Sequence, residues 1–194
     1  GEAANSLAIH VAGNVEAFVE MMNDKAEEIG MQDTQFVNPE GLHHKKQYTT
    51  AKDMAKLLDY SLNNADFKAI FTKESFRTSA TAAHPEGILL RSTVLTALQG
   101  EEQAGFTIIG GKSGTTYEAG QSWATLVVVD GREYISIVMG APLADISHPD
   151  KAQIKDTLDL FREKIVSEWH KKMPNLSKDL AFFCYIKLFF TKAT

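Results

Sequence analysis

The sequence predicts an α+β domain in which an antiparallel sheet packs against helices. Two observations support this class. Helical apolar periodicity dominates residues 2–71, and three apolar runs separated by turn signals follow between 106 and 141. A last helical pattern at about 150–169 would cover one face of the sheet. A group of helices next to a group of strands, without regular alternation of the two, is typical of α+β proteins.

The first two helices are expected at residues 2–12 and 14–30. Gly13 separates them, and Gly30 is a natural end for the second. In the second helix, apolar residues recur at steps of three and four and therefore form one face. These residues are Val15, Phe18, Val19, Met22, Ala26 and Ile29.

A loop separates these helices from a third one, expected at 51–62. Thr50 is placed to cap it, with Asp53 as the acid of a capping box. Its buried face is predicted to be Met54, Leu57, Leu58 and Leu62. Residues 63–105 are less regular, and we expect a short helix near 65–71 followed by mixed strand or loop.

Three strands are expected at 106–115, 122–129 and 133–139. Asp130-Gly131 is a two-residue hairpin turn between the last two. The first strand contains glycines, which indicates that backbone comes close to another group there. The closing helix at 150–169 places Ile154, Leu158, Phe161 and Ile165 on one face.

Composition narrows the classes of function. The 194 residues are 44% hydrophobic and 23% charged, with a net charge of −5, as in a folded globular domain that repels phosphate backbones. We therefore expect no nucleic-acid partner. The single cysteine, Cys184, excludes an internal disulfide and a cysteine zinc cage. Adjacent His43 and His44 lack a supporting carboxylate cluster, so no metal site or cofactor is predicted.

The beginning of the chain is abrupt. Residues 1–5 have neither the basic start nor the apolar run of a signal peptide, and 2–12 already has the pattern of a helix interior. We expect that the domain was cut from a longer protein.

The sharpest chemical signal is Lys112-Ser113-Gly114-Thr115 on the first strand. In a site that handles acyl groups, Lys112 would supply a positive field next to the nucleophile. The Ser113 hydroxyl would bind a substrate carboxylate or relay a proton. Gly114 would leave the strand bare for an added peptide strand, and the Thr115 N–H would face a developing oxyanion. A Lys-Ser-Gly triplet alone is also compatible with a strand that simply ends in a turn.

The context of this triplet resembles the penicillin-binding D-alanyl-D-alanine carboxypeptidases. The similar segments are 110–116 (Gly-Gly-Lys-Ser-Gly-Thr-Thr), Gly120, 130–131 and 138–141, and upstream 17–23, 30–31, 34–39, 41–42 and 48–55. They cover about residues 2–165 in the family's order, and Lys-Thr/Ser-Gly is the family's third motif.

The resemblance implies a β-lactamase/transpeptidase-like fold, with 1–170 as part of the catalytic domain. It also implies a serine-type carboxypeptidase that acts on peptidoglycan stem peptides through an acyl-enzyme and reacts with β-lactams. The parent protein would then work outside the cytoplasm, in a bacterial cell envelope. Lys112 would be catalytic, and Lys112, Ser113, Gly114 and Thr115 would bind substrate.

The sequence departs from this family in two respects. No serine is followed three residues later by lysine, so the nucleophile motif, its helix and the family's N-terminal strands are expected to lie upstream of Gly1. Thr49-Thr50-Ala51-Lys52 has the same spacing with a threonine in place of the serine. It lies, however, in a segment that matches a structural part of the family and not the nucleophile motif. In relatives an arginine often follows the third strand. The corresponding stretch of this chain, residues 141–148, contains no arginine, and His148 would be a weak substitute.

Several alternatives remain open. Under the carboxypeptidase hypothesis, the chain is expected to be inactive alone. The alternative is a non-catalytic, degenerate homologue that binds a peptide or a partner. A β-lactamase is disfavoured because no Glu-x-x-x-Asn pattern is found. Without N-terminal strands, an open sheet edge would favour self-association. The apolar tail at 171–194 is a packed strand or helix, a non-native extension, or an amphipathic anchor at a membrane surface.

Overall fold

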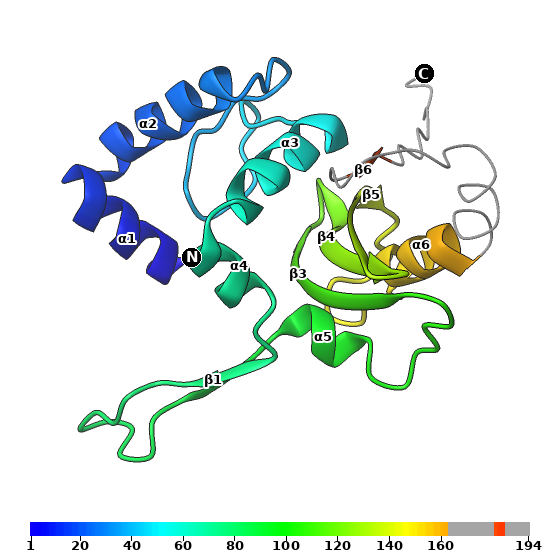
Figure 1. Cartoon of the computed structure of the whole chain (residues 1–194). Helices are drawn as coiled ribbons and strands as arrows, with labels where there is room; N and C mark the ends of the chain where they lie inside the picture. Colours follow the sequence, from blue (N-terminus) through cyan, green and yellow to red (C-terminus); the bar gives the residue numbers. More distant parts are fainter. Residues whose placement is uncertain (163–180, 185–194) are drawn as a thin grey trace.

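The structure, a computed structural model, describes residues 1–162 and 181–184. The helices of residues 2–71 lie on one side of a sheet, and a narrow hairpin projects from the body (Figure 1). In chain order the elements are α1 (Glu2–Ala12), α2 (Val15–Glu28), α3 (Ala51–Leu62), α4 (Ala65–Phe71), β1 (Ser75–Arg77), β2 (Leu89–Arg91), α5 (Thr93–Ala97), β3 (Thr107–Thr116), β4 (Gly120–Val129), β5 (Arg132–Ala141), α6 (Ala152–Leu160) and β6 (Ala181–Cys184).

The main sheet has the order β3-β4-β5-β6. The first three strands form antiparallel hairpins, as predicted, and the α+β class is confirmed. Asp130 and Gly131 both have positive φ, 49° and 76°. This is the backbone of a type I′ turn, whose twist matches that of the flanking strands. The turn therefore sets the register of β4 against β5, in which Thr125 lies opposite Ser136.

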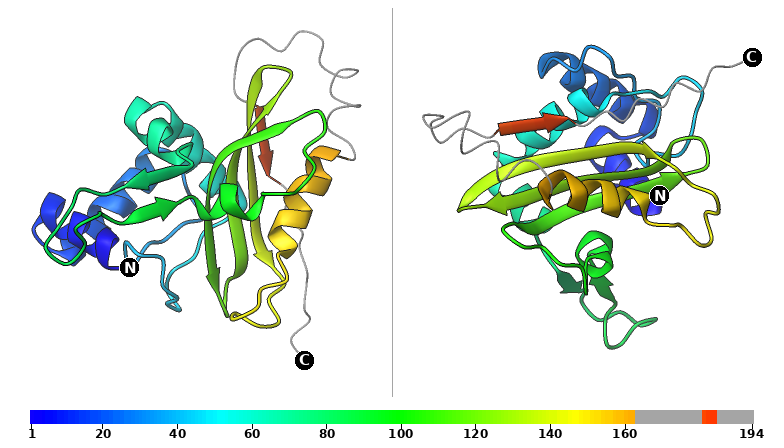
Figure 2. Two further views of the ribbon diagram at one scale, coloured as in Figure 1. Left: turned by 90° about the horizontal axis from the view of Figure 1, so that it is seen from below. Right: turned by 90° about the vertical axis from the view of Figure 1, so that its right-hand side faces the viewer.

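The two faces of the sheet are covered by different helices (Figure 2). One face packs against α5 and α6 through a cluster formed by Val94, Leu98, Phe106, Ile108, Trp123, Val127, Val129, Tyr134, Val138, Ala141, Ile154, Leu158 and Phe161. On the other face, α3 packs against β5. Ala55 and Leu58 of the helix lie there with Ile135 and Ile137 of the strand, and Met54 and Leu62, two of the predicted residues, are partly buried against them.

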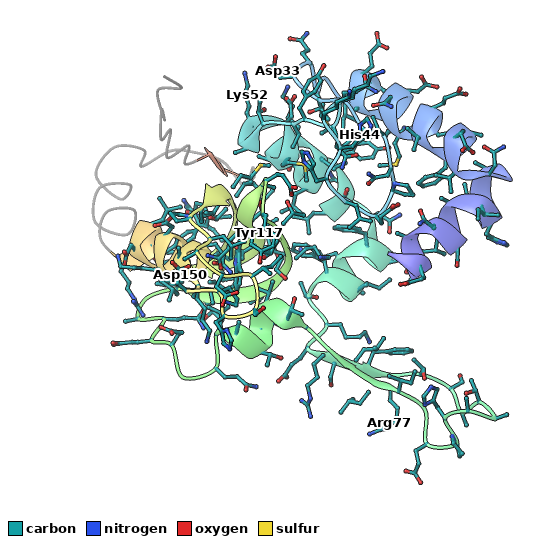
Figure 3. The ribbon with its side chains drawn as sticks, turned by 180° about the vertical axis from the view of Figure 1, so that it is seen from behind. Asp33, His44, Lys52, Arg77, Tyr117 and Asp150 are labelled. Atoms are coloured by element: carbon teal, nitrogen blue, oxygen red, sulfur yellow. The ribbon has the colours of Figure 1, made fainter. Side chains whose placement is uncertain are left out.

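Asp53 has a different role from the predicted one. Thr50 caps α3 by accepting a hydrogen bond from the N–H of Asp53 at 3.1 Å, as expected. The Asp53 carboxylate, however, is 1% exposed and is directed to the preceding loop. It accepts hydrogen bonds from the N–H of Asp33 at 2.8 Å, the hydroxyl of Thr34 at 2.9 Å and Nζ of Lys56 at 2.9 Å. Asp53 thus ties the loop that contains Asp33 to the start of α3, where Lys52 lies (Figure 3 labels Asp33 and Lys52).

The structure defines the stretch at 63–105, where a short helix and mixed strand or loop were expected. It contains α4 and two short strands that pair as the hairpin of β1 and β2, and also α5, which was not predicted. The edge of β5 is paired in part, because β6 pairs with Tyr134–Ile137 in parallel, whereas the outer edge of β3 is unpaired among the described strands; self-association stays a prediction. An apolar segment of strand length next to unpaired backbone groups explains this pairing. The second half of the helix predicted at 150–169, and the tail at 171–194 apart from β6, lie outside the described residues.

Candidate functional site

All four candidate site residues lie in β3, at the edge of the main sheet. Lys112, Ser113, Gly114 and Thr115 pair with Ala124, Trp123, Ser122 and Gln121 of β4. No strand pairs with the other edge of β3 in the described part of the chain. Side chains alternate along a strand, so Lys112 shares a face with Gly110 and Gly114, whereas Ser113 and Thr115 lie on the opposite face. The outer edge of β3 is open to an added strand.

Two glycines before this motif let other segments approach β3 closely. A Cβ atom on Gly110 would lie 2.6 Å from the carbonyl oxygen of Phe71 and 2.9 Å from Cα of Thr72. On Gly111 it would lie 2.7 Å from Cγ1 of Val94. These are distances that a side chain cannot adopt, and they explain why glycine is needed where α4 ends and where α5 packs. Gly114, in contrast, has nothing within 4 Å of that position.

A groove of about 480 Å³ lies alongside β3. It is lined by Phe67, Ile70, Phe71, Lys73, Arg91, Ser92, Thr93, Gly111 and Lys112. Its apolar wall comes from α4, and its polar wall from the ends of the hairpin and from β3. Ligand sites commonly combine an apolar wall with a few charged and hydroxyl groups in this way.

The polar groups near the motif are connected to one another. The hydroxyl of Ser113 lies 2.8 Å from the hydroxyl of Thr93, at the start of α5. Nζ of Lys112 donates to the carbonyl oxygen of Ser113. The Thr93 contact restricts the rotamer of Ser113, so the direction of that hydroxyl depends on α5.

Sequence patterns did not identify Lys73, Arg91 or Thr93 as groove residues. They belong to the stretch that we expected to be irregular, and they are brought to β3 by the hairpin and α5. The basic residues before the first hairpin strand and at the end of the second were the available signal, but spacing alone does not show which cations face the same groove.

The remaining candidates lie on loops. His44 accepts a hydrogen bond from the N–H of Lys46. His148 is 86% exposed at its side chain and lies 3.1 Å from a carboxylate oxygen of Asp145. That hydrogen bond, together with one from the N–H of Ser147, lowers the pKa of Asp145 below its usual value. The charge of a protonated His148 would therefore be compensated by Asp145.

In the described part of the chain, no group of three His, Cys, Asp or Glu side chains is placed to hold a metal ion. None of the described helices has both the length and the apolar character needed to cross a bilayer.

Comparison with known proteins was made for the sequence and for the fold. The profile of a family described as D-alanyl-D-alanine carboxypeptidase matches residues 1–143. The D-alanyl-D-alanine carboxypeptidase DacA of Haemophilus influenzae is 30% identical over 144 residues, which are 73% of this chain and 34% of that protein. A D-alanyl-D-alanine endopeptidase of Escherichia coli is 48% identical over 56 residues, 29% of this chain and 18% of that protein.

Solved structures show the same fold. A D-alanyl-D-alanine carboxypeptidase of Mycobacterium tuberculosis superposes with a TM-score of 0.64 at 25% identity, covering 82% of this chain and 58% of that one. Penicillin-binding protein 6B of Escherichia coli superposes with a TM-score of 0.60 at 25% identity, covering 82% and 47%. The chain spans about a third of the length of the curated carboxypeptidases that it matches.

Proposed function

The chain belongs to the D-alanyl-D-alanine carboxypeptidase family, and on this premise we propose that β3 forms one wall of a site for the D-Ala-D-Ala end of a peptidoglycan stem peptide. In the complete reaction a serine attacks the carbonyl carbon of the penultimate D-Ala. The terminal D-Ala leaves with its amine protonated, and water hydrolyses the resulting acyl-enzyme. This substrate places the working protein in the bacterial cell envelope.

The observation that carries the proposal is the position of Lys112-Ser113-Gly114 on an open edge strand beside a groove. The peptide would lie along the outer edge of β3 as an added strand, because no strand pairs with that edge in the described part of the chain. Lys112 would stabilise negative charge that develops in the transition state, and the N–H of Thr115 would donate to the oxyanion. Ser113, oriented by Thr93, would bind a substrate carboxylate.

The nucleophile does not come from a Ser-x-x-Lys motif in these residues, because no serine in the sequence has lysine three positions later. Thr49, which has that spacing to Lys52, hydrogen-bonds to the hydroxyl of Thr34 at 2.9 Å. We therefore propose that the 194 residues alone supply substrate contacts without turnover.

Labelling with a fluorescent penicillin tests this function. The chain alone is expected to form no covalent adduct. A version extended upstream along its native gene is expected to form one, because it supplies the serine and its lysine. In the extended protein, K112A should slow labelling by about 10²–10³-fold, the usual effect of removing a group that stabilises an oxyanion.

The matched control is K52A, at an exposed position at the start of α3 (Figure 3). It should label at the unchanged rate. An extended protein that contains Ser-x-x-Lys and stays unlabelled would reject the enzymatic hypothesis. An adduct on the chain alone would disprove its inactivity.

The second candidate function is a non-catalytic homologue that binds peptide. The absence of an arginine from residues 141–148, the stretch after β5, favours it. It is accepted if no Ser-x-x-Lys is encoded upstream and the chain still binds D-Ala-D-Ala peptides.

A further inference from the structure

A strip of buried polar side chains lies between the sheet and α6. Among the described residues, five buried atoms of this strip have no hydrogen-bond partner: Oε1 of Gln121 and of Gln153, Nε1 of Trp123, Oγ1 of Thr125 and Oγ of Ser136. Gln121, Thr125 and Ser136 are 0% exposed, Trp123 is 3% exposed and Gln153 is 8% exposed. Buried polar groups in folded proteins are almost always paired with protein or with ordered water. We call these five residues the polar strip.

Four of the five residues project from one face of the sheet. Gln121, Trp123 and Thr125 occupy alternate positions of β4, so their side chains share a face. Ser136 of β5 lies directly opposite Thr125 and therefore projects from that face as well. Trp123 belongs to the same apolar cluster as Leu158 of α6. The polar strip therefore faces α6, whose packing on this side of the sheet is shown in Figure 2.

The fifth residue, Gln153, comes from α6 itself. It lies one turn before Thr157, which is 0% exposed and whose hydroxyl donates to the backbone carbonyl of Gln153 at 2.8 Å. Gln121 joins the sheet to the start of the same helix. Its Nε2 donates to a carboxylate oxygen of Asp150 at 2.6 Å, and that oxygen also accepts from the N–H of Ala152 at 3.3 Å. Polar groups thus enter this interface from both the sheet and the helix.

The chemistry of the five atoms indicates which ligand satisfies them. The indole N–H of Trp123 only donates a hydrogen bond, the amide oxygens of Gln121 and Gln153 only accept, and the two hydroxyls do both. Water donates and accepts, so it can pair with every member of the set. A metal cation would bind the oxygen atoms and leave the indole N–H unpaired. Water is therefore the ligand that fits.

We propose that the polar strip is an internal hydration site, in which ordered water joins β4 and β5 to α6 by hydrogen bonds. None of its residues lines the groove beside β3, so the site is separate from the proposed peptide site and needs no nucleophile. Water in this place offsets the cost of burying polar groups that the surrounding side chains leave unpaired. The alternative is a dry interface in which the hydroxyls of Thr125 and Ser136 bond to each other.

Two measurements on the 194-residue chain test the site. Oxygen-17 magnetic relaxation dispersion counts the water molecules that stay bound for longer than the protein takes to tumble. Nuclear Overhauser effects (NOEs) between water and the indole N–H of Trp123 then locate them. The variant W169F removes the other tryptophan and so identifies the Trp123 signal. We expect at least one long-lived water and an NOE between water and Trp123.

The double variant T125V/S136A removes two hydroxyls with little change of shape. It should lose at least one long-lived water and the NOE at Trp123, and its midpoint temperature of unfolding should fall by about 2–4 °C. T107V is the matched control, because Thr107 is an exposed threonine of the same sheet. It should keep the number of long-lived waters, the NOE and the midpoint temperature.

The remaining outcomes overturn the hydration site. They are a native chain without a long-lived water or without the NOE, a double variant that keeps every water, and an equal loss in T107V. If the double variant does not fold, the native chain and S136A alone decide, because S136A should weaken the NOE and an unchanged NOE contradicts the site.

A salt exchange separates water from a bound cation. The midpoint temperature should be the same in sodium, potassium and choline chloride at equal ionic strength. A midpoint that depends on sodium or potassium would identify a cation and overturn water as the ligand. None of these measurements involves penicillin labelling, so the hydration site and the proposed function stand or fall separately.

Discussion

Replacing Asp53 with alanine is expected to lower the free energy of unfolding by about 3 kcal/mol, the range found when one partner of a buried, hydrogen-bonded charge is removed. The carboxylate is 1% exposed and accepts three hydrogen bonds. Without it, the N–H of Asp33 and the hydroxyl of Thr34 lose their acceptor, and Lys56 loses its ion pair. Urea denaturation followed by circular dichroism measures the change.

Asp59 is the matched control because it lies on the same helix. Burial raises the pKa of Asp59, so its ionised form is disfavoured where it stands. D59A should therefore leave the free energy of unfolding within about 0.5 kcal/mol, or raise it slightly. If D53A is no more destabilising than D59A, the loop from 31 to 48 is not tied to α3 through Asp53.

The contribution of Asp53 should also depend on pH. Burial alone would raise its pKa, but hydrogen bonds from Lys56, Asp33 and Thr34 and the charge of Lys56 outweigh burial and lower it. Since the folded-state pKa lies below the ordinary value of about 3.9, the stabilisation is complete above that value and is lost as the pH falls through the folded-state pKa. The stability difference between the native sequence and D53A should therefore narrow below about pH 4. A difference that stays constant from pH 7 to pH 3 would contradict this assignment.

Local patterns were sufficient for most of the elements. The apolar spacing in α2 and the cap at Thr50 depend on residues within one or two turns of each other, and both are present in the structure. The turn at Asp130 and Gly131 is equally local, because it depends on the φ angles of two adjacent residues. The apolar run with glycines at 106–115 predicted a strand that carries Lys112, and β3 contains it.

Features that depend on distant segments could not be predicted. Every residue of β1 and β2 is exposed, so the hairpin lacks the alternation of apolar and polar residues that identifies a half-buried strand. Asp53 has the spacing of a capping-box acid, and only the folded loop shows that Asp33 and Thr34 are its partners. In the same way, Thr93 and Ser113 are brought together by the packing of α5 on β3.

Replacing Gly110 with alanine should lower the free energy of unfolding by about 3 kcal/mol, at the upper end of the usual range for overpacking. The new Cβ would lie 2.6 Å from the carbonyl oxygen of Phe71 and 2.9 Å from Cα of Thr72. Both contacts are with backbone, so no change of rotamer relieves them. The end of α4 would have to move away from β3, and this movement would displace Phe71 from the wall of the groove.

Gly114 lies on the same face of the same strand and provides the control. Nothing lies within 4 Å of its Cβ position, so G114A should change the free energy of unfolding by no more than about 0.5 kcal/mol. Its methyl group would nevertheless project from the face of β3 next to the side chains of the proposed peptide strand, and a fluorescence-anisotropy titration should show weaker binding of dye-labelled D-Ala-D-Ala peptides. If G110A unfolds with the same midpoint temperature as the native sequence, the close approach of α4 to β3 is refuted. A G114A variant that is stable and binds peptide with the native Kd would show that the ligand does not lie along β3.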